Sequence, residues 1–523
     1  MKMIYNIKDR PKFGQLIVFA IQQLLAIMAA TIAVPMIIGN GMQPSAALFG
    51  AGLGTLVYVL FTKAKSPVFL GSSFAFLGSM AAAFAGGVSV ALGYVGLIIG
   101  AVFAGLVYVI IALIVKFAGV NWINKIMPAV VIGPTVAIIG LSLAGNAIGD
   151  LTKTNVDTYY DASNYIIAGA SDAVDLKFED QNYNVVADLN DDGFIVLAKD
   201  TNMAKPIPAD KVMNLTVVKN QDNSISVKTN LGSPYVALIC GLITLAVTMI
   251  CSSYGKKMLK LIPFIIGICA GYLTASIFYL IGSLTNNPAL MVINYGAFTS
   301  LFEGGVTFNT FFAIPQFTFL TALGGVKEIT PEYIAAIAVA FIPVAFVVFA
   351  EHIADHKNIS SIIEKDLLEE PGLNRTLLGD GVGSMVGAIF GGCPNTTYGE
   401  SVACVAITRN ASVATIIATA ILAIGISFLN PFVTFLSTIP SCVMGGVCVS
   451  LYGFIAVSGL KMLQKVNLEE NKNLFTASVI LIAGIGGLTL TFGKVTITSI
   501  ACALILGILT NLMLKNAKDS AAE

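Results

Sequence analysis

Charged residues are scarce in this chain of 523 residues. Only 11% of them are Asp, Glu, Lys or Arg, whereas soluble domains contain about 25%. Hydrophobic residues make up 56%, and the mean hydropathy is +0.85. The shortage of charge excludes an ordinary soluble domain and indicates a protein built for a lipid bilayer. The formal net charge of zero also argues against a nucleic-acid partner.

Motifs of catalysis and metal binding are absent as well. The sequence has no GxSxG, HExxH or phosphate-loop motif, so we expect neither an enzyme nor a bound cofactor. Its eight cysteines lie in or beside apolar segments without paired spacing, which indicates packed side chains rather than a metal site or a disulfide framework. The opening MKMIYNIKDRPKFGQ lacks a small-residue cleavage pattern, so we expect no removable signal peptide.

The sequence is rich in apolar segments close to the ~20 residues that cross a bilayer as a helix. Fourteen such segments fall near residues 13–36, 45–62, 67–84, 88–115, 127–148, 234–253, 261–283, 335–354, 378–392, 396–408, 411–429, 432–456, 474–491 and 495–514. The third and the tenth are poor spanning helices, because the polar or irregular stretches PVFLGSS (67–73) and PNTTYGES (394–401) open them. Interrupted segments at matching places of two halves indicate a transporter's binding site. Since these two are seven apart, we predict an all-α membrane protein of two inverted seven-segment repeats.

Basic residues support this count. The loops assigned to the inside hold twenty Lys and Arg, and the short outside loops hold only Lys327 and Lys494. Positive charge concentrates on the cytoplasmic side of membrane proteins, so the asymmetry predicts that both termini are cytoplasmic. We therefore expect a multi-pass protein of the cytoplasmic membrane, surrounded by lipid.

Residues 150–233 are the one soluble-looking piece, between segments 1–5 (residues 1–149) and segments 6–14 (residues 234–523). The piece carries thirteen Asp and Glu against seven Lys, and its short alternating runs flank turn-forming residues. These features predict an acidic, β-rich insertion outside the membrane. Within it, Asp188, Asn190 and Asp192 match the first half of a calcium loop. Because Lys199 replaces the bidentate glutamate of that loop, a hairpin turn without metal is the favoured interpretation.

Two carboxylates lie in the apolar segments. Glu351 follows the apolar run 335–350, and Glu400 follows Gly399 in the tenth segment. Charged side chains within spans are costly and usually mark a pathway or a proton relay. An interfacial Glu351 near Lys357, about 9 Å along the helix, is the alternative for the first. For Glu400 the alternative is a carboxylate that only favours the positive end of a helix dipole.

The only two histidines of the chain lie beside Glu351 in the motif EHIADH (351–356). In a helix, Glu351 and Asp355 share one face, whereas His352 and His356 share the next. These groups can exchange protons, which makes the motif a candidate for proton coupling. Two alternatives stay open: a metal-binding histidine pair, for which no third ligand is evident, and solvated histidines at a cytoplasmic helix end.

Four stretches together resemble the nucleobase–ascorbate transporters, in particular the uracil-transporting bacterial members. They are QQLLAIMAATIAVP (22–35), GSSFAF (71–76), AEHIADH (350–356) and PNTTYGES with AITR (394–409). The resemblance covers nearly the whole chain outside 150–233. It implies fourteen spans in two inverted repeats, a core domain of segments 1–4 and 8–11, and a gate domain of segments 5–7 and 12–14. It further implies short antiparallel strands that open segments 3 and 10, proton symport, and a homodimer.

The same resemblance assigns roles to individual residues. The positions that match the family's base-binding residues are Glu351, Glu400, Gly399, Phe74, Tyr398 and Ala30. The positions expected to couple the proton are Glu351, Asp355, His356 and His352. The chemistry fits, because uracil offers two N–H donors to carboxylates and two carbonyl acceptors to helix-terminal N–H groups.

The chain departs from the family pattern in three places. Gln22-Gln23 stands where Gln-His is common, Asp355-His356 where some relatives have His four residues after the glutamate, and Ser401-Val402-Ala403 where Asn-x-Gly is usual. We expect import of uracil with a proton by alternating access, with xanthine or another purine as the first alternative and Na⁺ coupling left open. The sulfate permease superfamily shares the architecture, but two pocket glutamates would repel an anion.

Overall fold

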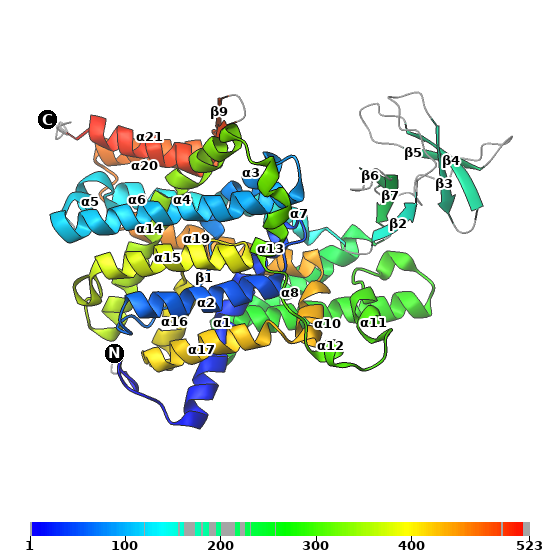
Figure 1. The fold of residues 1–523 in the computed structure, drawn as a ribbon, viewed down its shortest axis with the longest axis horizontal. Coiled ribbons are helices and arrows are strands. Elements are labelled where there is room, and N and C mark those ends of the chain that lie inside the picture. Colours follow the sequence, from blue (N-terminus) through cyan, green and yellow to red (C-terminus); the bar gives the residue numbers. More distant parts are fainter. Residues whose placement is uncertain are drawn as a thin grey trace.

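The computed structural model describes most of the chain. The residues described are 3–119, 121–154, 157–161, 173–178, 181–187, 195–199, 215–219, 225–230, 232–256, 258–492 and 495–515. The calcium candidates Asp188, Asn190 and Asp192 lie outside these residues, so that prediction stays untested. Figure 1 shows a body of helices from which the strands β2 to β7 project to one side.

A first helix group contains the elements of segments 1–4 and 8–11. Its members are α1 (Phe13–Ile38), α2 (Pro44–Phe61), β1 (Leu70–Ser72), η1 (Phe74–Phe76), α3 (Leu77–Ala85), α4 (Val90–Ala118), α14 (Pro331–Ile363), α15 (Leu373–Gly391), β8 (Asn395–Thr397), α16 (Gly399–Thr408) and α17 (Val413–Ile426). The helix α2 packs on α15. In addition, α15 packs on α4, and α2 packs on α17.

A second helix group contains the elements of segments 5–7 and 12–14. Its members are α6 (Ala129–Ser142), α7 (Ala144–Leu151), α8 (Pro234–Tyr254), α9 (Met258–Leu261), α10 (Pro263–Leu284), α19 (Ser441–Leu463), α20 (Asn471–Ile485), β9 (Leu490–Phe492), β10 (Val495–Ile497) and α21 (Ser499–Met513). Short helices connect the groups: α5 (Asn121–Ile126), α11 (Gly296–Phe302), α12 (Phe308–Phe311), α13 (Thr318–Ala322) and α18 (Asn430–Ser437).

The packing repeats itself when each segment is exchanged for the one seven later. In the first group, α1 packs on α17, and their counterparts α14 and α4 pack on each other. In the second group, α8 packs on α10, and their counterparts α20 and α21 pack on each other. Likewise α8 packs on α19, and their counterparts α20 and α6 pack on each other. An interface that survives this exchange is the signature of two inverted repeats.

Most elements match the predicted segments. Among the described residues, eight helices are long and apolar enough to cross a membrane, and they coincide with segments 1, 2, 4–8 and 12. Five shorter apolar helices coincide with segments 3, 10, 11, 13 and 14, and the glycine-rich α15 lies at segment 9. The all-α architecture is confirmed, and the count of fourteen spans stays a prediction.

Two predicted boundaries differ most from the structure. The eighth segment was expected to end at residue 354, but α14 continues to Ile363, because one side of its last turns stays buried. The twelfth segment was expected to begin at 432, but α18 ends at Ser437 and α19 begins at Ser441, after Pro440. Proline lacks the N–H that a continuous helix needs, and hydropathy alone does not register that loss.

The strands that the structure describes between residues 157 and 230 form two small sheets. The order β2–β7–β6 joins β2 (Asp157–Asp161), β7 (Ile225–Asn230) and β6 (Leu215–Lys219), all antiparallel. The order β3–β4–β5 joins β3 (Ala173–Phe178), β4 (Gln181–Ala187) and β5 (Ile195–Lys199) in the same way. Both lie within the predicted insertion; its place relative to the membrane stays a prediction.

Candidate functional site

Two half-helices begin back to back in the middle of the first helix group. The strands β1 and β8 pair antiparallel, with Leu70 opposite Thr397 and Ser72 opposite Asn395. This pairing confirms the strands predicted for segments 3 and 10. The helices η1 and α3 follow β1, and α16 starts at Gly399 directly after β8. Helix N-termini leave their first N–H groups without intrahelical partners and carry partial positive charge, so both starts attract carbonyl oxygens or anions.

Glycine is required in the strand pair at position 71. A Cβ atom on Gly71 would lie 2.3 Å from the ring of Tyr398, far inside van der Waals contact. The Tyr398 hydroxyl donates a hydrogen bond to the Ser72 carbonyl at 2.7 Å. The buried tyrosine therefore fastens the second strand over the first, with its ring on the bare glycine backbone.

One face of α14 brings carboxylates to the strand pair and the start of α16. The Thr397 hydroxyl of β8 donates to Asp355 Oδ2 at 2.8 Å, and Asp355 Oδ1 lies 3.9 Å from the place of a Cβ on Gly399. Glu351, one turn earlier, interacts electrostatically with Asp355 and Glu400, and all three are partly exposed. Since α14 continues to Ile363, Glu351 does not end its helix, and its depth in the membrane stays a prediction.

Glu400 lies in the first turn of α16. The N-cap of this helix is Tyr398, whose side chain makes no capping bond, and Glu400 is the acidic residue of the first turn. A carboxylate there is stabilised by the helix dipole, as the alternative interpretation proposed. The same position places the carboxylate near Glu351, so the two interpretations are compatible.

The other face of α14 is a buried polar layer. His352 and His356 are both 0% exposed, so the interpretation as solvated histidines is wrong. Their rings stack with centroids 4.0 Å apart, and His356 Nδ1–H donates to the His352 carbonyl at 2.9 Å. The Tyr58 hydroxyl of α2 lies 2.8 Å from His356 Nε2 and 2.7 Å from Ser66 Oγ. Each of the four ring nitrogens has a hydrogen-bonding neighbour.

Asp380 of α15 completes this layer and was missed in the sequence. Its Oδ2 lies 2.7 Å from His352 Nδ1, and the side chain is 1% exposed. The signal was available, because Asp380 is a carboxylate inside the ninth apolar segment and the cost of intramembrane charge applies to it as much as to Glu351.

Two departures from the family pattern contact each other. Gln23 of α1 donates from Nε2 to Ser401 Oγ of α16 at 2.5 Å. The Phe69 backbone N–H, just before β1, donates to the same oxygen at 3.0 Å. Ser401 thus ties α1, β1 and α16 together behind the N-terminus of α16, and a change at either side-chain position would need a matching change at the other.

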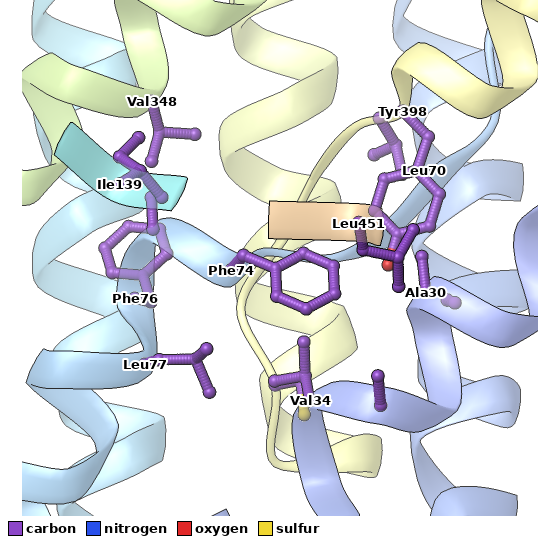
Figure 2. Close-up of a cluster of buried hydrophobic side chains, with 14 of the residues drawn as sticks. Ala30, Val34, Leu70, Phe74, Phe76, Leu77, Ile139, Val348, Tyr398 and Leu451 are labelled. Carbon is purple, nitrogen blue, oxygen red and sulfur yellow. The ribbon is translucent and has the colours of Figure 1, made fainter. Parts of the chain in front are cut away.

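Phe74 closes the site toward the second helix group. Its ring is 8% exposed and meets the ring of Tyr452 on α19 edge to face, with centroids 5.7 Å apart. Figure 2 shows Phe74 among buried apolar side chains that include Ala30 of α1 and Tyr398. Tyr452 was not predicted; its buried hydroxyl has no hydrogen-bond partner among the described residues.

A cleft lies between the two helix groups, beside α3. Its volume is about 450 Å³, and it is lined by the C-terminal end of α1, by residues 77–85 and by Leu143 and Asn146. The start of α16, whose residues do not line this cleft, combines N–H donors, carboxylate acceptors and an aromatic ring. This combination suits a small planar molecule with both N–H and carbonyl groups.

Comparison with known sequences agrees with the resemblance. The model of the Permease family (Xan_ur_permease) matches residues 14–179 and 223–492. The uracil permease of Bacillus caldolyticus is 34% identical over 524 residues, 99% of this chain and 96% of its own length. The uracil permease of Bacillus subtilis (strain 168) is 33% identical, over 100% and 98%. That of Escherichia coli (strain K12) is 30% identical, over 98% and 94%.

These matches span the whole fold rather than one motif. The chain belongs to the nucleobase–ascorbate transporter family. It is a multi-pass membrane protein of a transporter family rather than of an enzyme family.

Solved structures agree on the fold alone. The transmembrane domain of a cyanobacterium bicarbonate transporter, BicA, superposes with a TM-score of 0.53 at 13% identity, over 97% of this chain and 99% of that one. SLC26A9 superposes with a TM-score of 0.54 at 11% identity, over 97% of this chain and 66% of that one. At such identity the likeness confirms the inverted-repeat architecture and carries no information on substrate.

Proposed function

We propose that this protein imports uracil together with a proton. The observation that carries the proposal is the meeting of the α14 carboxylates with the N-terminus of α16, beside Phe74. Uracil permeases that align over nearly the full length of the chain support uracil as the base. Glu351, Glu400, Gly399, Phe74, Tyr398 and Ala30 are the proposed base-binding residues.

The proposed binding mode follows from donor and acceptor chemistry. The carboxylates of Glu351 and Glu400 accept the two N–H groups of uracil, and the N–H groups at the start of α16 donate to a carbonyl. Phe74 covers one face of the ring, where an edge or offset aromatic contact is favourable. Gly399 is exposed, so its backbone can approach the base without a side chain in the way.

The proposed proton partner is the carboxylate group of the same site. Glu351, Asp355 and Glu400 lie close enough to repel one another when all are ionised. A bound proton removes one negative charge from this group and thereby favours binding of a neutral base. The proposed site of coupling between proton and base is therefore the pair Glu351 and Asp355.

Alternating access needs two bodies that move against each other. The two helix groups contact each other mainly through α1, which touches α9, α10 and α19, and α14, which touches α6, β10 and α21. We propose that the first group is the core domain, which carries the site, and the second the gate domain. The cleft beside α3 then lies on the proposed extracellular side.

The proposed orientation predicts which loops can meet. Lys65 and Glu370, both assigned to the inside, form an ion pair at 2.6 Å. Ser89 and Glu328, both assigned to the outside, form a hydrogen bond. These same-side contacts support the alternation of loops between the two sides, and the distribution of Lys and Arg supports cytoplasmic termini in the cytoplasmic membrane. A homodimer is a further proposal, tested by the mass of the detergent-free particle.

Transport in proteoliposomes tests the proposal. Labelled uracil should accumulate under an inward proton gradient, equally in sodium and choline buffers, and unlabelled uracil should compete better than xanthine, ascorbate or sulfate. Uptake that follows xanthine would replace the base by a purine, and uptake that needs sodium would replace the proton. Failure to transport any of the four compounds would reject the proposal.

A further inference from the structure

The histidine face of α14 contains a buried acid–base pair apart from the proposed substrate carboxylates. His352 Nδ1 and Asp380 Oδ2 lie 2.7 Å apart, and His352 Nε2 lies 3.0 Å from Thr376 Oγ1. His352 is 0% and Asp380 1% exposed, so neither group reaches solvent. The pair joins α14 to α15, the two helices on either side of the layer.

The hydrogen bonds around the pair fix how many protons it holds. The Thr376 hydroxyl donates its single hydrogen to the Leu373 carbonyl at 3.0 Å, so its oxygen accepts from His352 Nε2–H. With Nε2 protonated, a neutral His352 has a bare Nδ1, which needs a hydrogen from Asp380. If His352 instead donates from Nδ1 as well, it is an imidazolium facing a carboxylate. In both arrangements the pair holds one proton and has no net charge.

The surroundings favour this protonated pair. Asp380 Oδ1 is buried and has no hydrogen-bond partner among the described residues. An ionised carboxylate with one oxygen unpaired in a buried site is costly, whereas a carboxyl group tolerates a bare carbonyl oxygen far better. No described Lys or Arg forms an ion pair with Asp380.

The ionisable groups that face the pair come from three helices. Tyr108 of α4 lies edge-on to the His352 ring, with centroids 6.2 Å apart, and its buried hydroxyl is unpartnered. His356 of α14 stacks on His352, and Tyr58 of α2 follows beyond His356. Glu351 and Asp355 lie on the adjacent face of α14, and both interact electrostatically with Asp380. A proton at the pair is thus felt by the substrate carboxylates without contact.

We propose that Asp380 and His352 form a second proton-binding site, which binds one proton behind the substrate site and releases it during transport. On release, the pair changes from a neutral hydrogen-bonded unit to a neutral imidazole beside a carboxylate, and the proton leaves the protein. On uptake the reverse occurs, so charge and atoms balance. The transport half of this proposal rests on the proposed proton coupling, because intramembrane ionisable groups mark such pathways.

Nitrogen NMR of labelled histidine tests the shared proton directly. The chain has two histidines, so the wild-type protein gives two imidazole signals, and His356→Gln leaves that of His352 alone. At neutral pH we expect His352 Nε2 to carry hydrogen and Nδ1 to be in a strong hydrogen bond. A neutral ring with hydrogen on Nδ1 and a bare Nε2 would overturn the proposal, because Asp380 would then need no proton. This readout does not depend on the transported substrate.

Asp380→Asn tests the release. The amide donates to His352 Nδ1 with a hydrogen that cannot leave, so we expect uracil affinity to stay within about threefold while proton-driven accumulation falls about 10²-fold. Exchange of labelled for unlabelled uracil at equal pH should continue. The control is Asp366→Asn, an exposed carboxylate, which should behave as wild type. Wild-type accumulation by Asp380→Asn would show that the proton stays in place and would overturn the proposal.

Discussion

The two faces of α14 carry similar side chains in different surroundings. On one face, Glu351 and Asp355 are partly exposed and lie beside the start of α16. On the other, His352 and His356 are fully buried between α2, α4 and α15, and each ring nitrogen has a hydrogen-bonding neighbour. Carboxylates whose lone pairs face an accessible site can serve a ligand, whereas imidazoles already bonded to protein groups cannot. We therefore propose ligand binding for the first face, and packing and proton storage for the second.

The largest effect should come from the carboxylate face. Glu351→Gln removes the proposed charged acceptor for uracil, and we expect the affinity for uracil to fall about 10²-fold, the value of a charge-assisted hydrogen bond. Binding to purified protein, measured by calorimetry, checks it. Glu332→Gln, in the first turn of the same helix, is the control and should bind as wild type. Equal affinity in both variants would remove Glu351 from the site.

A smaller effect should come from the support of that face. Thr397→Val removes the hydroxyl that donates to Asp355, and we expect about tenfold weaker uracil binding, or about 1.4 kcal/mol. Thr396→Val is a matched control in the same strand, because the buried Thr396 hydroxyl has no hydrogen-bond partner among the described residues. If both variants lose the same affinity, strand packing rather than the Asp355 contact is responsible.

The histidine face should respond in stability rather than in binding. Tyr58→Phe leaves His356 Nε2 and Ser66 Oγ without their shared hydroxyl, which should cost about 1–3 kcal/mol of stability. Thermal unfolding in detergent should show this loss, with uracil affinity within about twofold of wild type. A variant that is as stable as wild type but binds uracil poorly would assign ligand binding to the histidine face as well.

The smallest effect should come from the surface beyond α14. The hydrogen bond and charge of Lys65 hold the pKa of Glu370 below its ordinary value. A carboxylate whose pKa is lower in the folded than in the unfolded protein stabilises the folded state at pH values above its unfolded-state pKa. This contribution is lost as the pH falls through the pKa of the folded state. Both side chains are exposed, so Glu370→Gln should shift the unfolding temperature barely measurably at pH 7 and not at all near pH 3. A larger shift of the unfolding temperature near pH 3 than at pH 7 would contradict this prediction, because protonated Glu370 has no charge to pair with Lys65.

The two interrupted segments could be predicted from the sequence, for a physical reason. Pro67 and the polar run 394–401 cannot form a lipid-exposed helix, so they had to be covered or to line a cavity. That strands open both segments and pair, as β1 and β8 do, was implied by the family resemblance. The family resemblance added that Glu351 and Glu400 belong to one site, which hydropathy does not reveal.

The burial of the histidines could not be read from hydropathy. Polar residues after 354 suggested that the helix leaves the membrane, because a hydropathy average ignores which side of the helix each residue occupies. The buried positions His352, His356, Ile359 and Ile363 recur at helical spacing and would have extended the helix. Asp380 was overlooked among glycines, and its partner on α14 is known only once α14 and α15 are packed together.

The contact of Gln23 with Ser401 shows the same limit. Each was recognised as a departure from the family pattern, but residues 378 positions apart cannot be paired from one sequence. The structure turns two separate departures into one hydrogen bond behind the start of α16.

The most direct test of the carboxylate face is a distance between the base and the protein. Solid-state NMR on membranes, with ¹⁵N-uracil and ¹³C in the glutamate carboxyl groups, measures that contact. We predict a distance of about 4 Å between a uracil nitrogen and a glutamate carboxyl carbon, as an N–H to carboxylate hydrogen bond requires. The signal of this contact should persist in Glu332→Gln and weaken in Glu351→Gln. The absence of any short contact at saturating uracil, or an unchanged contact in Glu351→Gln, would contradict the account.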